Sequence, residues 1–455
     1  MDPKEKIRSV VDACADCDSC RYIMDTVCLM FPELYRLYDR EREEGEGITA
    51  AELRDLVDCC NFCALCPCPN IRADIMEAKT GYIQRDGLPV TIRIMEDVAW
   101  VGRICGAYPG LTNRLFGEGL AGRTLKRMAG IHPDRRIPRF PSEPFDAWAL
   151  RRKLDATPKG TARKVAYFAG CTGRYLFPDV PKAAVRILEK AGIDVYFPDQ
   201  GCCGMPTLLE GDRKRTLDFA ASNIHRLARL AEDGYDILCA CPTCGYMLKT
   251  VLKEGAYYSD AYQKSVGLEP GVMKLPSDRR KTGSADDEFV RLKSSMYGRI
   301  LKDEGYFSSI DPMARIAAAE NTYDLGEYLR DLLEAGDLDF EFAPVAGKLA
   351  YYPPCHLREQ EIGRPWLDLL ERLPGIDPIP IESSFYCCGI AGIMGFKRDF
   401  HETSMKMGAP LMDKIREIDP DVLLTDCLSC RIQFNQMTDR PVLHPIQILD
   451  NAYPS

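Results

Sequence analysis

The sequence predicts a mixed α+β and α/β fold, in which a helical, cysteine-rich module precedes two copies of an α/β unit. From about residue 161 onward, short apolar segments alternate with amphipathic helical segments, as in parallel-sheet domains. One pattern of five cysteines occurs twice in this region at a nearly constant offset, which indicates an internal duplication. The first 80 residues instead carry two dense cysteine motifs between helical segments.

Composition limits the class of protein. With 455 residues the chain is long enough for two or three domains, and 46% hydrophobic and 28% charged residues are typical of a soluble globular protein. The net charge of −9 argues against a nucleic-acid partner. The start of the chain is charged, and no apolar run is long enough for a membrane span. We therefore expect a cytoplasmic chain that can lie against the inner face of the cell membrane.

The cysteine content of 21 residues requires an explanation. Disulfides are disfavoured in a reducing cytosol, so clustered cysteines there are more often metal ligands or redox groups. Nine of the cysteines lie between residues 14 and 68, and ten more form the two repeated sets. The two remaining cysteines, Cys105 and Cys239, are interpreted as packing residues because an isolated thiol packs as a small hydrophobe.

The expected N-terminal module, residues 1–80, contains two C-x2-C-x2-C triplets. In two-cluster ferredoxins each triplet holds one iron–sulfur cube, and the fourth ligand comes from the other motif. Between the motifs, residues 48–57 read as a helix with Thr49 as N-cap and Glu52 completing a capping box. The triplets are Cys14, Cys17 and Cys20, then Cys60, Cys63 and Cys66.

The fourth ligands are assigned by the same ferredoxin rule. It pairs the first triplet with Cys68 and the second with Cys28, and Pro69 follows Cys68 as the ferredoxin pattern requires. The spacing departs from the usual gap of three residues, which leaves Cys59 as an alternative fourth ligand for either set. A zinc ribbon is a competing interpretation, although it would show paired knuckles rather than triplets.

Residues 81–160 are expected to be a helical connector followed by an extended linker. The segment 119–131, "GLAGRTLKRMAGI", is basic and amphipathic. We interpret it as a helix that faces the core, with a partner-facing or membrane-facing helix as the alternative. The stretch 132–145, "HPDRRIPRFPSEPF", is rich in proline and arginine and predicts the extended linker.

The two α/β units are expected at residues 161–260 and 346–455. In each, a short apolar strand ends at a cysteine, a helix and a second strand lead to an adjacent cysteine pair, and a longer helix leads to a strand that ends in C-x2-C. Between them, residues 261–345 are expected to form a helical insert with a mobile loop at about 265–288, where large apolar residues are few.

The spacing of the repeated cysteines is C-x30-CC-x37-C-x2-C in the first unit and C-x31-CC-x38-C-x2-C in the second. Strand ends of an open α/β sheet lie together, so each unit should bring five thiolates to one place. A glycine after each pair, Gly204 or Gly389, lets the chain turn close to an inorganic centre. Five thiolates exceed the four of a cubane or zinc site, and spacing alone does not say what the fifth one does. The sets are Cys171, Cys202, Cys203, Cys241 and Cys244, and Cys355, Cys387, Cys388, Cys427 and Cys430.

These motifs resemble the cysteine-rich CCG domains of the heterodisulfide reductase-related iron–sulfur oxidoreductases. The phrases "YYPPCHLRE" and "LHPIQIL" are also similar to this family, whose members include iron–sulfur subunits of glycerol-3-phosphate, glycolate and lactate oxidising complexes. The resemblance implies two cubane [4Fe-4S] clusters in the ferredoxin-like module. It also implies one noncubane [4Fe-4S] cluster in each CCG unit, with the two units related by a pseudo-twofold axis.

The function implied is electron transfer between a partner flavoprotein dehydrogenase or oxidase and an acceptor, which is menaquinone, another quinone or a different acceptor such as a disulfide. We expect no flavin on this chain. His356, next to Cys355, is a candidate for a hydrogen bond that supports the ligands. The alternative is a catalytic disulfide reductase with its chemistry at the CCG clusters. A zinc-binding scaffold explains less, because zinc has no redox chemistry.

Overall fold

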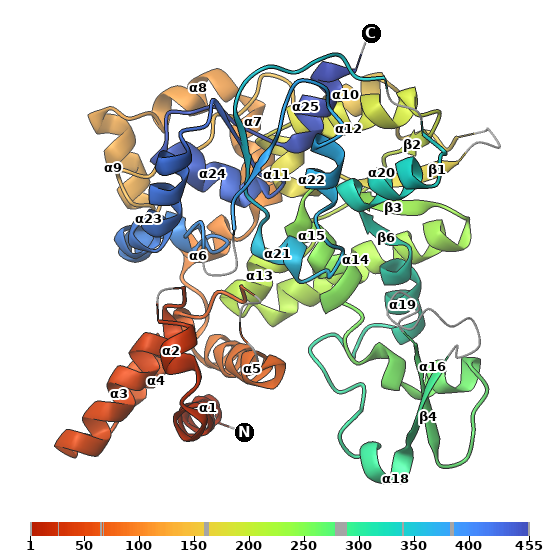
Figure 1. The fold of residues 1–455 in the computed structure, drawn as a ribbon. Helices are drawn as coiled ribbons and strands as arrows, with labels where there is room; N and C mark the ends of the chain where they lie inside the picture. Colours follow the sequence, from red (N-terminus) through yellow and green to blue (C-terminus); the bar gives the residue numbers. More distant parts are fainter. Residues whose placement is uncertain are drawn as a thin grey trace.

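The computed structural model describes residues 2–25, 27–63, 66, 68–158, 163–277, 289–338, 341–382 and 386–453. Figure 1 shows a helical N-terminal module at the lower left, a central body that contains both sheets, and a small lobe at the lower right. Within the described residues, no helix is both long and apolar enough to cross a bilayer. The prediction of a mixed fold with parallel α/β sheets is confirmed.

The N-terminal module consists of helices around a core of its own, which includes Ile7, Val11, Leu34 and Leu56. The expected helix between the cysteine motifs is present, with the Thr49–Glu52 capping box. The last helix continues to Asp86, six residues past the expected boundary, and it packs along the first helix. The helices are α1 (Pro3–Cys17), α2 (Cys20–Ile23), α3 (Met30–Glu44), α4 (Ala50–Asp58) and α5 (Pro69–Asp86).

The connector forms short helices that lie beside the C-terminal helices of the body (Figure 1). The basic helix of this region does not face the core as we expected. Leu120 and Met128 are exposed, while Gly122 and Lys126 are buried, and Lys126 donates to the carbonyl oxygen of Pro133 over 3.4 Å. The helices are α6 (Val90–Met95), α7 (Val98–Ala107), α8 (Pro109–Leu115), α9 (Leu120–Met128) and α10 (Phe145–Arg151).

The first sheet has four parallel strands in the order β2-β1-β3-β6. Its central strand is buried almost along its whole length, as expected for a sheet covered on both faces. The strands are β1 (Lys164–Phe168), β2 (Asp194–Tyr196), β3 (Asp236–Cys239) and β6 (Thr322–Asp324), and the helices between them are α11 (Gly170–Tyr175), α12 (Asp179–Lys190), α13 (Met205–Glu210), α14 (Arg213–Glu232), α15 (Pro242–Tyr246) and the π-helix η1 (Met247–Val251).

The second sheet is also parallel, and its order β8-β7-β9-β10 is the order of the first sheet with each strand replaced by its counterpart. The strands are β7 (Leu349–Tyr351), β8 (Ile379–Pro380), β9 (Val422–Leu424) and β10 (Val442–Leu443). Its helices are α21 (Cys355–Arg358), α22 (Pro365–Leu370), η3 (Met394–Phe396), η4 (Arg398–Phe400), α23 (His401–Ile418), α24 (Leu428–Met437) and α25 (Pro445–Ala452).

The region between the units differs from the helical insert that we expected. β6 belongs to the first sheet, and α20 continues from it with a capping box, so the first unit uses residues far beyond 260. Part of the expected loop is an antiparallel pair of strands, and residues 278–288 lie outside the described residues. The elements are η2 (Ala256–Tyr258), α16 (Asp260–Ser265), β4 (Val272–Pro276), β5 (Phe289–Lys293), α18 (Ser294–Tyr297), α19 (Pro312–Glu320) and α20 (Leu325–Glu334).

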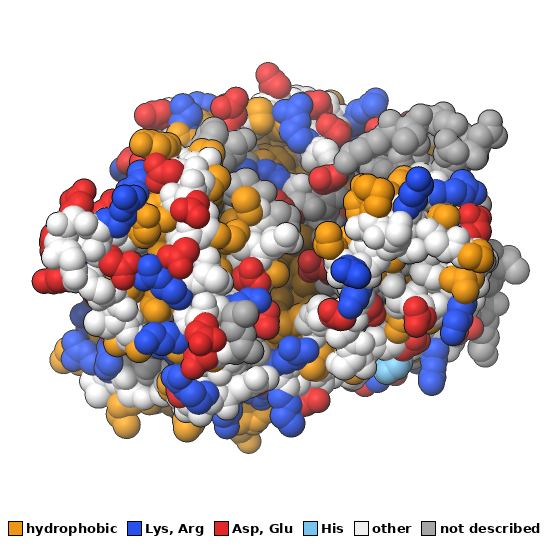
Figure 2. Space-filling model, turned by 90° about the horizontal axis from the view of Figure 1, so that it is seen from below, with side chains coloured by type: hydrophobic (Ala, Val, Ile, Leu, Met, Phe, Trp, Pro, Cys, Tyr) orange, Lys and Arg blue, Asp and Glu red, His pale blue; other side chains and the backbone are white. Residues whose placement is uncertain are grey.

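The two units share one continuous hydrophobic core, which extends from Val165 of the first sheet to Leu424 of the second. Helix α12 of the first unit packs against α25 of the second. Figure 2 shows the molecule from below. Charged side chains of both signs cover this surface, and hydrophobic side chains are visible in the depression between the left and right halves of the view. The units therefore form a single body with the cysteine-bearing turns inside it.

Candidate metal centres at the repeated cysteines

The first unit gathers its five cysteines where the carboxyl ends of β1 and β3 lie side by side. Cys171 lies in α11 directly after β1, and its Sγ is 3.8 Å from Sγ of Cys202. Cys203 and Cys244 contact each other through their thiols, and Cys241 is the N-cap of α15. All five side chains are buried. The structure thus brings together the complete set that the spacing predicted.

The second unit repeats this arrangement. Cys355 opens α21, Cys427 caps α24, and Sγ of Cys388 lies 3.1 Å from Sγ of Cys430. The backbone N–H of Cys430 points to Cys427 Sγ over 3.5 Å, and that of Gly389 points to Cys387 Sγ over 3.3 Å. Backbone N–H groups are thus directed at two of the sulfurs, as is common around thiolate ligands.

The glycines after the cysteine pairs adopt the left-handed conformation, with φ of 95° at Gly204 and 89° at Gly389. Their surroundings differ. A Cβ at Gly389 would lie only 2.2 Å from the backbone oxygen of Ser404 on α23, whereas the nearest atom to a Cβ at Gly204 would be 3.4 Å away. Both turns therefore need the left-handed conformation, but only the second needs the missing side chain for helix packing.

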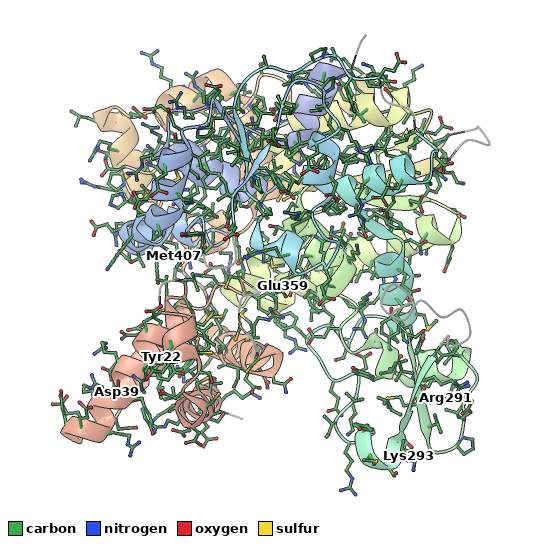
Figure 3. The ribbon with its side chains drawn as sticks, viewed as in Figure 1. Tyr22, Asp39, Arg291, Lys293, Glu359 and Met407 are labelled. Carbon is green, nitrogen blue, oxygen red and sulfur yellow. The ribbon has the colours of Figure 1, made fainter. Side chains whose placement is uncertain are left out.

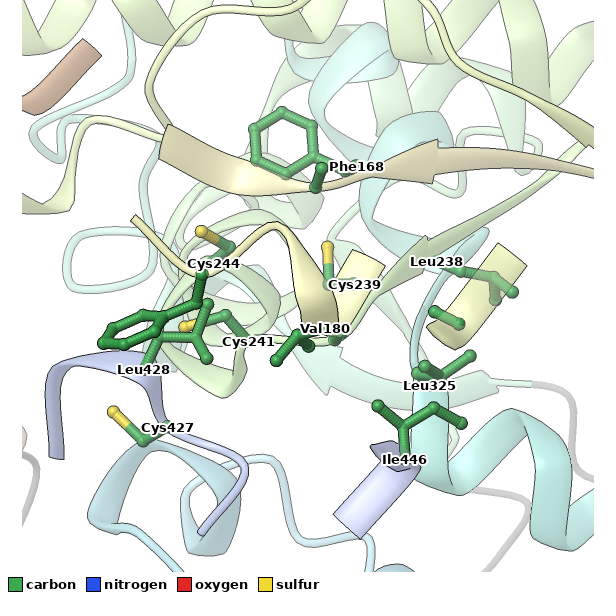
Figure 4. Close-up of a cluster of buried hydrophobic side chains, with 14 of the residues drawn as sticks. Phe168, Val180, Leu238, Cys239, Cys241, Cys244, Leu325, Cys427, Leu428 and Ile446 are labelled. Atoms are coloured by element: carbon green, nitrogen blue, oxygen red, sulfur yellow. The ribbon is translucent and has the colours of Figure 1, made fainter. Parts of the chain in front are cut away.

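The two cysteine sets touch each other. The thiol of Cys241 in the first unit interacts with that of Cys427 in the second, and Thr243 Oγ1 is 3.7 Å from Cys427 Sγ. Figure 4 shows Cys241, Cys244 and Cys427 on the same side of the packed cluster, with Cys239 set apart along the strand. Spacing within one repeat carries no information on this contact between repeats.

The N-terminal cysteines form two neighbouring groups. Cys14 lies within electrostatic range of Cys17, Cys20 and Cys68, and also of Cys66 from the second triplet. Cys28 lies near Cys60 and Cys66. Cys66 is therefore near both groups, Cys68 lies near the first triplet, and Cys28 lies near two thiols of the second.

The alternative ligand Cys59 is oriented differently. Its Sγ lies 3.6 Å from the backbone oxygen of Asp55 in its own helix. The groups that act on this thiol are Glu33, Asp58, Lys79 and Cys60, so its contacts are mainly with side chains outside the triplets. Cys59 thus lies near one triplet thiol, Cys60, whereas Cys68 lies near Cys14 and Cys20, and Cys28 near Cys60 and Cys66.

The N-terminal module joins the second unit through its cysteine loop. Cys63 acts electrostatically on both Cys355 and Cys387. His356 connects three parts of the chain: its Nε2 donates to the Phe62 oxygen over 3.3 Å, and its Nδ1 lies 3.1 Å from Thr243 Oγ1. Burial lowers the pKa of His356, which keeps the ring neutral and suited to one donated and one accepted bond.

Burial governs the chemistry of most of these thiols. It raises the pKa of Cys14, Cys28 and Cys355 to about 12, so these sulfurs stay protonated at neutral pH unless a cation replaces the proton. Among the described residues, no three His, Cys, Asp or Glu side chains are arranged around a point where a single metal ion would sit. The buried set of five thiols in the second unit, with backbone N–H groups directed at two of its sulfurs, fits an iron–sulfur group.

An apolar cavity of about 430 Å³ adjoins the second unit's thiols. Its lining combines cysteines of the N-terminal module and of the second unit with apolar side chains of the connector, among them Trp100, Phe116 and Met128. Figure 3 shows Met407, another lining residue, on the side of the body that faces the N-terminal module. The apolar cavity therefore lies next to the cysteines that are near both the N-terminal module and the connector.

Several residues at the site were not identified from the sequence. Asn223 on α14 donates to the Cys202 oxygen over 2.7 Å and accepts from Gly201 N, and Ser404 Oγ on α23 donates to the Gly389 oxygen over 2.6 Å. Each holds a cysteine-pair turn from the following long helix. Both are polar residues on amphipathic helices, and the sequence pattern of such a helix does not distinguish them from polar residues on its exposed face.

Comparison with known families decides the nature of the repeat. The family model of the CCG cysteine-rich domain matches residues 165–249 and again residues 349–435, and each match includes all five cysteines of its set. Each of the two repeated units is thus similar to the CCG cysteine-rich domain. The resemblance of the two motifs to CCG domains is thereby confirmed, and the two units are called the first and second CCG domains below.

Proteins similar to this chain include subunits of oxidoreductases. One subunit of the anaerobic glycerol-3-phosphate dehydrogenase from Escherichia coli is 24% identical over 70% of this chain and 66% of its own length. One subunit of the CoM/CoB fumarate reductase from Methanothermobacter marburgensis is 25% identical over 66% of this chain and 48% of its own length. Lactate utilization protein A of Exiguobacterium is 24% identical over 63% of this chain and 95% of its own length. The match thus spans just under two thirds of the first relative and about half of the second.

Proposed function

We propose that this chain is the iron–sulfur electron-transfer subunit of a flavin-dependent dehydrogenase. One observation carries the proposal: the four cysteine sets form a continuous row through the protein. The second N-terminal set meets the second CCG domain where Cys63 lies beside Cys355 and Cys387. The second CCG domain meets the first where Cys427 contacts Cys241. Such a row suits one-electron carriers that follow one another over short steps.

The cysteines supply the ligands. Cys14, Cys17, Cys20 and Cys68 would hold one cubane [4Fe-4S] cluster, and Cys60, Cys63, Cys66 and Cys28 a second. Each five-cysteine set would hold one noncubane [4Fe-4S] cluster, which explains the fifth thiol. When bound, these groups accept and release single electrons. The chain's own part is to hold them in order, exclude water through burial of the sulfurs, and direct N–H groups such as that of Gly389 at them.

The electron donor would be a separate flavoprotein, as the relatives named as dehydrogenase and reductase subunits suggest. Its docking place would be the N-terminal module, whose triplets stand at one end of the row. Cys17 and Cys68 are exposed there, so the first set comes close to the surface. Tyr22 and Asp39 mark this surface in Figure 3.

The acceptor would be a quinone, met at a membrane surface by the connector. Large apolar side chains are exposed along α6–α9, and arginines such as Arg93, Arg103, Arg114 and Arg127 lie exposed among them. Apolar side chains that penetrate a headgroup layer, flanked by cations, suit an anionic bilayer surface. The apolar cavity behind these helices reaches the thiols of the second CCG domain. The exposed apolar residues are Val90, Ile94, Trp100, Ile104, Tyr108, Leu111, Leu115, Leu120 and Met128.

Anaerobic purification of the native complex, followed by metal and flavin analysis, tests this function. Four [4Fe-4S] clusters require about 16 iron atoms per chain, with flavin on a co-purifying protein. Zinc with little iron would exclude electron transfer and leave a scaffold. Iron with flavin on this chain itself would contradict the assignment of a separate donor.

A catalytic disulfide reductase is the second candidate, because two complete CCG sets touch at Cys241 and Cys427. A disulfide placed between them could receive one electron from each side, and each sulfur would leave as a thiolate. Electron paramagnetic resonance of the oxidised protein with added thiol distinguishes the two functions. A new thiol-dependent signal supports the reductase, and unchanged spectra with retained quinone reduction support the relay.

A further inference from the structure

Arg135, in the extended stretch between the connector and the first CCG domain, is fully buried. Its Nη1 donates to Gln433 Oε1 over 2.7 Å, and its guanidinium lies 4.7 Å from the centre of the Phe396 ring. The other two nitrogens, Nε and Nη2, are buried without a hydrogen-bond partner among the described residues. Leaving charged N–H groups unmatched in a protein interior is costly, so the geometry calls for an acceptor.

Cys388 of the second CCG domain is the thiol that interacts with this guanidinium. Arg135 and Cys388 act on each other electrostatically, and Gln433, which holds Arg135, lies on α24 one turn after Cys430. Among the ion pairs of the described residues, none involves Arg135; the nearby Asp134 pairs with Arg123 instead. Among the described residues, the guanidinium charge near Cys388 is therefore not offset by an ion pair with a carboxylate.

Two buried carboxyl groups lie near cysteines of the first CCG domain. Asp426 acts electrostatically on Cys241, and Asp324 on Cys239, and both carboxyl groups are fully buried. Tyr351 donates to Asp426 Oδ1 over 3.1 Å, and the Gly326 N–H to Asp324 Oδ1 over 2.8 Å. The duplicated sets thus share ligands but differ in the buried polar groups around them.

We propose that Arg135 is a positioning residue for the iron–sulfur centre of the second CCG domain, with Nε and Nη2 donating hydrogen bonds to its sulfur atoms. This rests on the proposed function, since it needs a centre in that domain. Reduction adds one negative charge to the centre, and a buried cation beside it stabilises that charge. The centre of the second domain then has a higher reduction potential than it would have without Arg135.

An anaerobic redox titration followed by electron paramagnetic resonance tests this on the whole protein. The variants are Arg135→Gln and Arg135→Lys, and Cys388→Ser identifies the signal of the second domain by removing it. In Arg135→Gln we expect the ratio of reduced to oxidised centre at a fixed potential to fall at least about tenfold, which is 59 mV for a one-electron couple. Arg135→Lys keeps the charge and should lie between this variant and the wild type.

Arg136→Gln is the matched control, because it removes the same charge from the adjacent, exposed position. Its potential should equal that of the wild type. A wild-type potential in Arg135→Gln with full iron content overturns the inference. If Arg135→Gln loses iron from the second domain alone, the contact is supported. Loss of all clusters in both Arg135 variants means a purely structural role and overturns the inference. Absence of iron in the wild type would instead refute the proposed function.

Discussion

At the scale of single residues, His356 shows how one side chain can connect three parts of the chain. Its ring stacks on Tyr246 at 5.0 Å between centres, and its nitrogens reach the cysteine loops of the N-terminal module and of the first CCG domain. From the sequence, His356 was a candidate for supporting the ligands only because it follows Cys355. Its partners Phe62 and Thr243 each lie within a C-x2-C spacing, and no single-chain pattern predicts that these spacings meet.

His356→Phe should lower the free energy of unfolding by about 1–3 kcal/mol. Phenylalanine keeps the stacking on Tyr246 but leaves the buried Phe62 carbonyl without its donor. Thermal unfolding of the anaerobically purified protein measures this change. The exposed His225→Phe is the matched control and should stay within about 0.5 kcal/mol of the wild type. Equal stability of both variants would show that the two hydrogen bonds are not formed.

Cys59→Ser and Cys68→Ser should differ in iron content. Because the Cys59 thiol points to its own helix, its loss should leave the iron content unchanged. Cys68 lies beside Cys14 and Cys20, and its loss should remove about four iron atoms, one cubane, per chain. Colorimetric iron analysis of anaerobic samples is sufficient. The reverse result would make Cys59 the fourth ligand.

At the scale of elements, each long helix that follows a cysteine pair closes on the turn that holds the pair. The strands, the helices between them and the left-handed glycines could be predicted from alternating segments and the duplicated spacing. The fourth strand of the first sheet could not, because the excursion of residues 256–320 separates it from the repeat. The burial of Lys126 could not be predicted either. The amphipathic pattern of this helix does not show that the face with the small residue Gly122 is the buried one.

Gly389→Ala should be more damaging than Gly204→Ala. Both place a Cβ on a left-handed residue, which costs about 1–2 kcal/mol. Only at Gly389 does the new atom also collide with the backbone of α23, so α23 must move and the total should exceed about 3 kcal/mol. Thermal unfolding and iron content report the difference. Equal losses at the two positions would contradict the tighter packing of the second turn.

Glu96, at the end of α6, makes the contact between the connector and α14 sensitive to pH. Burial, with the charge of Asp212 on the other side, raises the pKa of Glu96 to about 8, although Arg215 lies 3.4 Å away and opposes the shift. The folded protein thus keeps a proton that the unfolded chain releases above the ordinary pKa of 4.5. Stability from this group is present at low pH and is lost as pH rises toward 8.

Glu96→Gln should therefore gain stability relative to the wild type as pH rises. The glutamine amide replaces the protonated acid, and one proton is worth at most about 1.4 kcal/mol per pH unit. Thermal unfolding at about pH 5.5 and about pH 8 measures the difference, which should be small at the first and reach a few kcal/mol at the second. The exposed Glu118→Gln should show no such trend. A pH-independent difference would mean that Glu96 is ionised in the fold.

At the scale of the whole molecule, the row of cysteine sets leads from the N-terminal module to the second CCG domain and then to the first. The chain order of the domains suggests the opposite sequence, with the first CCG domain next to the module. The structure reverses it because the connector and the stretch around Arg135 run back along α24, where Arg136 Nη1 donates to the Asn435 oxygen over 3.2 Å. The apolar outer face of the connector therefore lies over the middle of the row rather than at its end.

Binding to lipid vesicles is the remaining test of this arrangement. Leu120 and Tyr108 expose 85% and 74% of their surface on the connector. Burying two such side chains in a bilayer is worth about 3–6 kcal/mol, so Leu120→Glu with Tyr108→Glu should reduce co-sedimentation with anionic vesicles at least about tenfold. Leu268→Glu, at a residue 64% exposed near the strands of the small lobe, should have no effect. Equal binding of both proteins, or binding only to neutral vesicles, would contradict a basic, apolar membrane face on the connector.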